Sequence, residues 1–140
     1  YSDFLVNAVT GDLKVQENKS EVWVSYKGEN VTTYHYSVYL ADYNVVAEVT
    51  PTERAAHFKF TFPKSDESYI ILDAFNEGSM VKIIPEERKI IGYCRNNSGG
   101  VPDNFHNYFV AEFDIDFELN HTWTNGWQLV QNSVNSEGEH

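Results

Sequence analysis

Short extended segments separated by turn residues recur along almost the entire chain, and this pattern limits the possible folds more than any other feature. No stretch long enough for a stable helix has apolar side chains at the helical spacing. The links between segments, such as "ADYN" at 41–44 and "PEER" at 85–88, are short and rich in turn-forming residues, which favours antiparallel hairpins. The sequence therefore predicts an all-β fold, an antiparallel β-sandwich. The predicted strands are Val22–Tyr26, Ser37–Leu40, Val45–Thr50, Ala55–Phe62, Tyr69–Asp73, Met80–Ile84, Lys89–Cys94, Asn107–Phe113 and Trp127–Val130.

Length and composition predict a single folded domain. The chain has 140 residues, of which 41% are hydrophobic and 15% aromatic. A domain of this size buries roughly 70% of the surface that its unfolded chain exposes. The last stretch, "NSVNSEGEH", is small and polar. We therefore expect a β-sandwich over residues 1–131 and a frayed tail or linker over residues 132–140.

The charge balance excludes some classes of partner. Twenty-one acidic residues against ten basic ones give a net charge of −11 at pH 7. Such a field repels phosphate backbones and anionic lipid surfaces, and no basic run offsets it locally. No apolar run reaches the ~18 residues that span a bilayer. We expect neither a nucleic-acid partner nor membrane insertion.

Residues of the common catalytic and metal-binding motifs are sparse. Cys94 is the only cysteine, so the chain cannot form an internal disulfide, and its five histidines lack the spacing of zinc ligands. The chain also has no nucleophile elbow, P-loop or dinucleotide-binding fingerprint. From these residues we expect no catalytic group, no metal site and no cofactor within the chain.

The loop "RNNSGGVPDNFHN" at 95–107 is the strongest candidate for a binding site. Loops of this length in compact domains often carry function. Its amide, carboxylate and basic groups can bond to sugar hydroxyls, and Tyr93, Phe105 and Tyr108 lie nearby in the sequence. The candidate substrate- or interface-binding residues of this loop are Arg95, Asn96, Asn97, Asp103 and His106.

Three further candidates lie elsewhere, and each also has a purely structural interpretation. In "TPTERAAHFKFTFPKSD" at 50–66, Arg54 can pair with Glu53 and brace the turn, and His57 follows at the start of a half-buried strand. An alternative is that Arg54 and His57 face a ligand or an interface. Trp127 can stack on a sugar or belong to the core.

The segment "EFDIDFEL" at 112–119 alternates four carboxylates with four apolar residues. An extended chain places the carboxylates on one face, where glycoside hydrolysis or calcium binding can use them. Any solvent-facing strand shows the same alternation, and the segment lacks a calcium-binding loop. We therefore predict a solvent-facing strand here.

Two long blocks of the sequence resemble a known family. "YHYSVYLADYNVVAEVTPTERAAHFKFTFPKSDESYIILD" at 34–73 and "IIGYCRNNSGGVPDNFHNYFVAEFD" at 90–114 resemble the N-terminal β-sandwich domain of glycoside hydrolase family 92. The opening "YSDFLVNAVTG" resembles the strand and turn that precede the first block in that family. The family consists of calcium-dependent exo-acting α-mannosidases.

The resemblance implies a supersandwich of the galactose-mutarotase type within a larger two-domain enzyme. It also implies that the sandwich packs on an (α/α)6 catalytic barrel, which carries the acid, the base and most calcium ligands of an inverting reaction. This chain would then be non-catalytic and inactive alone, and would help to shape a pocket for a mannose-rich glycan. The family's role in glycan breakdown implies an exported protein, periplasmic or extracellular. A stand-alone carbohydrate-binding module and a structural or adhesive sandwich are the alternatives.

Overall fold

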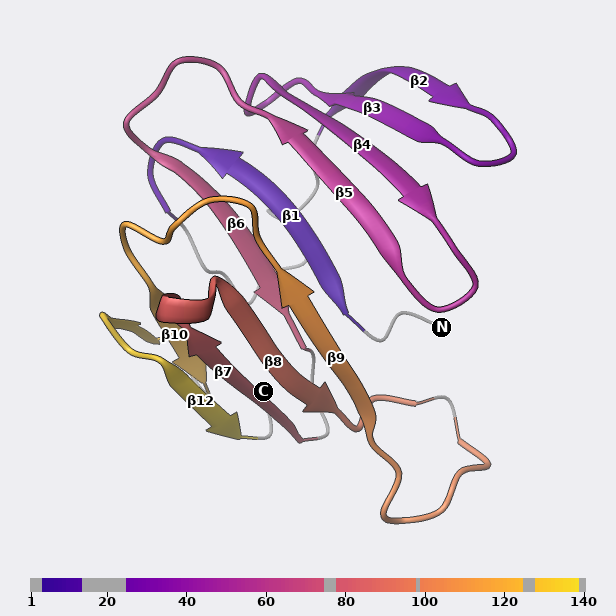
Figure 1. Cartoon of the computed structure of the whole chain (residues 1–140), viewed down its shortest axis with the longest axis vertical. Helices are drawn as coiled ribbons and strands as arrows, with labels where there is room; N and C mark the ends of the chain where they lie inside the picture. Colours follow the sequence, from indigo (N-terminus) through magenta and orange to yellow (C-terminus); the bar gives the residue numbers. More distant parts are fainter. Residues whose placement is uncertain (1–3, 14–24, 75–77, 98, 125–127, 139–140) are drawn as a thin grey trace. The chain divides into compact units, whose positions relative to one another are not determined.

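The computed structural model describes residues 4–13, 25–74, 78–97, 99–124 and 128–138. These residues form β-strands joined by turns, one 3-10 turn and no α-helix (Figure 1). Their ladders are antiparallel wherever the register is defined. The prediction of an all-β, antiparallel fold is confirmed. No helix long and apolar enough to cross a membrane occurs in this part of the chain.

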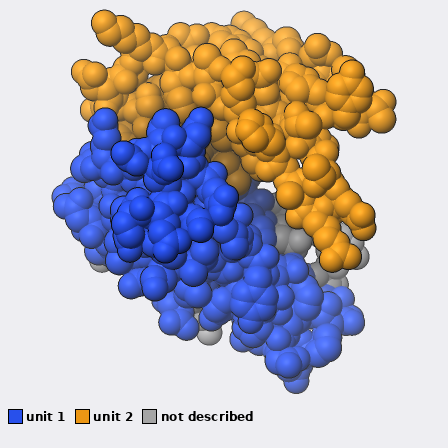
Figure 2. All heavy atoms as spheres, viewed as in Figure 1, with its two compact units in different colours: residues 1–5, 72–140 blue, residues 6–71 orange. Residues whose placement is uncertain are grey.

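The chain divides into two compact units, residues 6–71 and residues 1–5 with 72–140, which Figure 2 shows in orange and blue. In the first unit, the strands of a four-stranded sheet follow the order of the chain. They are β2 (Tyr26–Val31), β3 (Tyr36–Leu40), β4 (Val45–Pro51) and β5 (Ala56–Thr61). A two-stranded sheet pairs β1 (Leu5–Thr10) with β6 (Ser68–Asp73). The side chain of Thr10 donates a hydrogen bond to the carbonyl of Tyr43 at 2.8 Å, which ties β1 to the turn between β3 and β4.

A threonine closes each of the two turns at one end of the four-stranded sheet. Thr32 exchanges backbone and side-chain hydrogen bonds of 2.8–3.1 Å with His35 between β2 and β3. Thr52 makes the same set with Ala55 between β4 and β5, at 2.7–3.1 Å. A hydroxyl that bonds the backbone three residues ahead adds to the backbone hydrogen bond of the turn. Each turn is therefore fixed within its own four residues.

The apolar face of this sheet is buried in its middle and exposed at the end that carries the two turns. Val38, Val45 and Ala47 are at most 9% exposed. In the next row toward the turns, the register places Tyr36 opposite Val31 and Val49 opposite Phe58. Val31 is 66% exposed and Phe58 43% exposed, so we call the four residues of this row the open apolar row.

The second unit contains a four-stranded sheet in the order β12-β7-β8-β9. These strands are β7 (Ser79–Ile84), β8 (Lys89–Cys94), β9 (Asn107–Glu112) and β12 (Asn135–Gly138). The 3-10 turn Pro85–Glu87 connects β7 to β8, and Arg88 closes it in the left-handed conformation with φ 53°. β10 (His121–Thr124) and β11 (Gln128–Gln131) form a separate hairpin.

A close contact organises the buried face of this sheet. Gly92 in β8 lies opposite Phe109 in β9, and a Cβ on Gly92 would fall 2.8 Å from the Phe109 ring and 2.1 Å from the carbonyl oxygen of Met80. The Phe109 ring also lies against the Phe4 ring, with centroids 4.4 Å apart. Cys94, two residues along β8, is fully buried. A residue without a side chain thus makes room for an aromatic ring at the centre of the sheet.

Most predicted strands are present, and the differences concern five segments. Residues 22–24 of the predicted strand Val22–Tyr26 lie outside the described residues, and β2 begins at Tyr26. The family resemblance, and not the hydrophobic pattern, implied the strand β1. The hydrophobic pattern did not predict β10. The region 132–140, predicted to be a frayed tail or linker, contains β12, whose register with β7 pairs Asn135 with Lys82. The predicted strand at 112–119 is wrong, because β9 ends at Glu112.

Candidate functional site

The candidate loop connects β8 to β9 and extends beyond the paired ends of these strands (Figure 1). A hollow of about 300 Å³ lies against it. Arg95, Asn97, Asp103 and Phe105 line the hollow, together with residues 99–102. Gly99 and Gly100 both have positive φ angles, which glycine adopts without strain. Three of the five predicted loop residues, Arg95, Asn97 and Asp103, line this hollow, and their role in binding stays a prediction.

Hydrogen bonds within the loop hold the wall of this hollow in place. Arg95 Nη2 donates to the carbonyl oxygen of Asp103 at 2.6 Å, across the mouth of the loop. Asn97 bridges two backbone groups, because its amide donates to the Arg95 carbonyl and its oxygen accepts from the Gly99 N–H, both at 2.8 Å. Arg95 itself is anchored by a backbone hydrogen bond to the Gly78 carbonyl at 3.0 Å. Asn97 is thus occupied with supporting the loop, whereas the Asp103 carboxylate makes no contact with the described residues.

Three rings gather beside the loop, at the end of β8 and the start of β9. The ring of His106 meets Tyr93 edge-on, with centroids 4.6 Å apart, and stacks on Tyr108 with centroids 5.8 Å apart. Tyr93 and Tyr108 lie opposite each other in the β8–β9 register, with centroids 5.9 Å apart. Tyr108 is 76% exposed. Sequence reasoning named the two tyrosines only as neighbours of the loop, although the hairpin register alone would have paired them.

The His106 ring is oriented by the loop backbone. Its Nδ1 lies 2.8 Å from the carbonyl oxygen of Asn104. A carbonyl only accepts hydrogen bonds, so Nδ1 carries the proton and Nε2 of the neutral ring is an acceptor. Asn96, also predicted as a candidate, is half-buried and is not part of the wall of the hollow.

Arg54 and His57 belong to the other compact unit. Arg54 lies 4.0 Å from Glu53, and both side chains are at least 90% exposed. Exposed pairs of this kind contribute little stability. The predicted pairing of Arg54 with Glu53 is present, whereas the hydrogen bonds that close the turn come from Thr52. His57 is exposed on β5, opposite Thr50. Trp127 lies outside the described residues.

The carboxylates of 112–119 do not gather into a metal site. Phe113 and Phe117 contact each other with ring centroids 5.0 Å apart, and the acidic residues between and beside them are exposed. Among the described residues no three His, Cys, Asp or Glu side chains are positioned to hold an ion. Calcium takes six to eight oxygen ligands. The described part of this chain therefore does not fit the calcium ion that the family resemblance implies.

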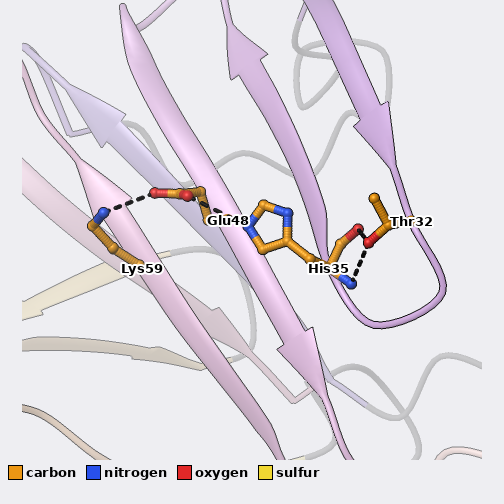
Figure 3. A network of polar contacts seen from close by, with 4 residues as sticks. All are labelled: Thr32, His35, Glu48 and Lys59. Carbon is orange, nitrogen blue, oxygen red and sulfur yellow. Dashed lines mark hydrogen bonds and ion pairs between the residues drawn. The ribbon is translucent and has the colours of Figure 1, made fainter.

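One polar network on the four-stranded sheet of residues 6–71 was not predicted (Figure 3). Glu48 on β4 accepts from Lys59 Nζ on β5 at 3.0 Å and lies 3.4 Å from Nε2 of His35. The hydrogen bond and charge of Lys59, with a smaller effect of His35, lower the pKa of Glu48 below its usual value. The register that pairs Glu48 with Lys59 is the signal that would have revealed the network.

Comparisons with known proteins identify relatives along the whole sequence. A family model described as the glycosyl hydrolase family 92 N-terminal domain matches residues 1–140. A comparison with curated proteins finds no match.

Solved structures give the same family. A family 92 inverting mannosidase from Bacteroides thetaiotaomicron superposes with a TM-score of 0.88 and 34% identity, covering 97% of this chain and 18% of that chain. A second family 92 α-mannosidase from that bacterium has a TM-score of 0.81 and 28% identity, covering 98% of this chain and 21% of the other. A structure described as that second enzyme in complex with mannoimidazole has a TM-score of 0.80 and 28% identity, covering 98% of this chain and 20% of the other. The chain spans about a fifth of the length of these enzymes.

Proposed function

The chain belongs to the N-terminal domain family of glycosyl hydrolase family 92, and on this premise we propose that the whole protein is an α-mannosidase that removes mannose from glycans. The observation that carries this proposal is the similarity to an inverting mannosidase over 97% of the chain, at 34% identity. Similarity of this extent runs along almost the entire chain and is not confined to a local motif.

We further propose that this chain supports catalysis without performing it. Inversion needs one carboxylic acid and one carboxylate on opposite sides of the scissile bond, with room for a water molecule between them. The chain corresponds to about a fifth of the related enzymes, so the catalytic groups have room in the remaining four fifths. In this proposal the domain packs on a catalytic domain and helps to shape the pocket for the glycan.

Calcium dependence and export belong to the same proposal. The ion would be bound by the catalytic domain, since the described residues of this chain offer no ligand set for it. Export to the periplasm or the cell exterior would bring the enzyme to its glycans. Both follow from the family resemblance.

The test compares the whole protein with the chain of residues 1–140. We expect the whole protein to release mannose from an aryl α-mannoside and from mannobiose, with loss of activity after chelation and recovery with calcium. We expect the separate chain to release none. Turnover by the separate chain would contradict the non-catalytic role, and a whole protein inactive on every α-mannoside would contradict the enzyme assignment.

A further inference from the structure

The loop of residues 95–106 combines a hollow with an exposed aromatic surface. The hollow of about 300 Å³ lies against Arg95, Asp103 and Phe105. Tyr108, 76% exposed, directly follows the loop and stacks on His106. Binding sites for small ligands combine concave shape, apolar walls and a few oriented polar groups. This region is concave and carries oriented polar groups within one hairpin connection, and its mainly polar lining includes the apolar residues Val101, Pro102 and Phe105.

Some polar groups at the hollow bond the loop itself, whereas others remain available to a ligand. Arg95 uses one of its N–H donors on the Asp103 carbonyl, and its guanidinium bonds no other described residue, so further donors remain for a ligand in the hollow. The Asp103 carboxylate contacts no described residue and offers acceptors only. In the neutral tautomer that bonds the Asn104 carbonyl through Nδ1, Nε2 of His106 is a further acceptor beside the loop. Donors and acceptors thus lie close together on a loop that Asn97 keeps in shape.

This combination fits a neutral polyhydroxylated ring better than an ion. One cationic and one anionic residue, Arg95 and Asp103, line the hollow, so it has no net charge of one sign, and the chain's net charge of −11 repels anions in general. Vicinal hydroxyls both donate and accept, which matches Arg95, Asp103 and His106. A pyranose also has an apolar face of C–H groups that can cover an exposed tyrosine ring.

We propose that residues 95–97 and 99–106, with Tyr93 and Tyr108, form a saccharide-binding site of this domain that acts without catalysing hydrolysis. The assignment of a mannose-bearing glycan as its ligand rests on the proposed function above. Such a site would hold a glycan chain on the enzyme between cleavage events, raising its effective concentration near the catalytic domain.

Affinity electrophoresis of the whole protein through gels containing soluble mannan, run in the cold, tests this site. We expect the wild type to be retarded, and Tyr108→Ala to weaken the interaction about three- to tenfold, the range of one lost aromatic contact. Asp103→Asn retains the backbone carbonyl that Arg95 bonds, and we expect a similar loss. Tyr34→Ala is the matched control, because Tyr34 is 71% exposed on the other unit. Far-UV circular dichroism confirms that each variant is folded.

Wild-type affinity in both loop variants, or a wild type that mannan does not retard, would overturn the proposal. Retardation by a sulfated glycan but not by mannan would overturn it as well, since it would mean an anion site. Turnover of an aryl α-mannoside by the same wild-type preparation separates the two hypotheses. Turnover without mannan retention contradicts only the binding site, whereas retention without turnover contradicts only the enzyme assignment.

Discussion

At the scale of single residues, the most restrictive position is one that has no side chain. Gly92 leaves room for the Phe109 ring on the buried face of its sheet, and the Met80 carbonyl closes the remaining space. Aromatic rings that cover a glycine of the neighbouring strand stabilise sheets in this way. The resemblance to family 92 includes this glycine in "IIGYC", but the sequence alone does not show which ring covers it.

We predict that Gly92→Ala destabilises the protein by about 1–3 kcal/mol, the usual cost of inserting a methyl group into a filled core. The backbone carbonyl of Met80 cannot move aside as a flexible side chain would. Hydrogen exchange of the peptides that cover β7 and β8 measures the loss in the whole protein, where it should appear as faster exchange at those amides. Val110→Ala on β9 is the control, because Val110 is 65% exposed. It should change the opening free energy obtained from exchange by less than about 0.5 kcal/mol. Equal effects of the two variants would contradict the packing described for Gly92.

We predict that the thiol of Cys94 reacts with iodoacetamide only after local unfolding. Cys94 is 0% exposed, so a reagent reaches it only in an opened state. Alkylation resolved by peptide mass spectrometry should be at least about a hundredfold slower than in denaturant, which corresponds to an opening free energy near 3 kcal/mol. Labelling in the native protein at the denatured rate would mean that the buried face of this sheet is open.

At the scale of elements, strands with their own hydrophobic alternation were predictable and strands that depend on a neighbour were not. β3, β4, β5, β7 and β8 alternate or carry continuous apolar runs, and the sequence predicts all of them. β12 reads "NSEG" and has no apolar face, so its extended form depends on the ladder with β7. The prediction of a strand over residues 112–119 was wrong for the converse reason. The alternating pattern continues after Glu112, but no strand among the described residues pairs with it.

The candidate site shows the same distinction between features that the local sequence predicts and features that depend on a neighbouring strand. Residue type and loop length were sufficient to predict Arg95, Asn97 and Asp103 around one hollow. The ring cluster depends on the pairing of Tyr93 with Tyr108, which is a property of the hairpin register and not of the loop sequence. Residue chemistry therefore predicted the loop, whereas the ring cluster beside it could be predicted only from the strand register.

The network across β4 and β5 gives a prediction for pH dependence. Lys59 and His35 lower the pKa of Glu48 in the folded protein, so the ionised carboxylate stabilises the fold above the unfolded value of 4.5. This stabilisation is lost as the pH falls through the lower folded pKa, since protonation removes the charge that Lys59 and His35 contact. At pH 7, Glu48→Gln should speed hydrogen exchange in β4 and β5. The difference from wild type should shrink below about pH 4.5 and vanish at still lower pH.

Glu118→Gln is the matched control for Glu48→Gln. Glu118 is exposed and contacts no described residue, so its substitution should leave exchange in β4 and β5 unchanged at every pH. A difference between Glu48→Gln and wild type that persists unchanged into acid would show that the ion pairs are not its cause.

At the scale of the whole molecule, the chain exposes apolar side chains that a larger protein can cover. The open apolar row of Val31, Tyr36, Val49 and Phe58 lies across one sheet, and its two ends, Val31 and Phe58, are 66% and 43% exposed. Exposed apolar rows of this kind commonly mark interfaces. The related enzymes are about five times longer than this chain. We therefore expect the remainder of the whole protein to pack on this row.

Hydroxyl-radical footprinting distinguishes a covered row from an open one. In the whole protein we expect oxidation of Phe58 to fall several-fold relative to the separate chain of residues 1–140, because aromatic rings react in proportion to their exposure. Tyr108 should react equally in both samples, since a saccharide-binding site must stay accessible to its ligand. Equal oxidation of Phe58 in both samples would contradict packing on the open apolar row. Protection of Tyr108 in the whole protein would instead assign the β9 surface, and not the four-stranded sheet of residues 6–71, to the interface with the catalytic domain.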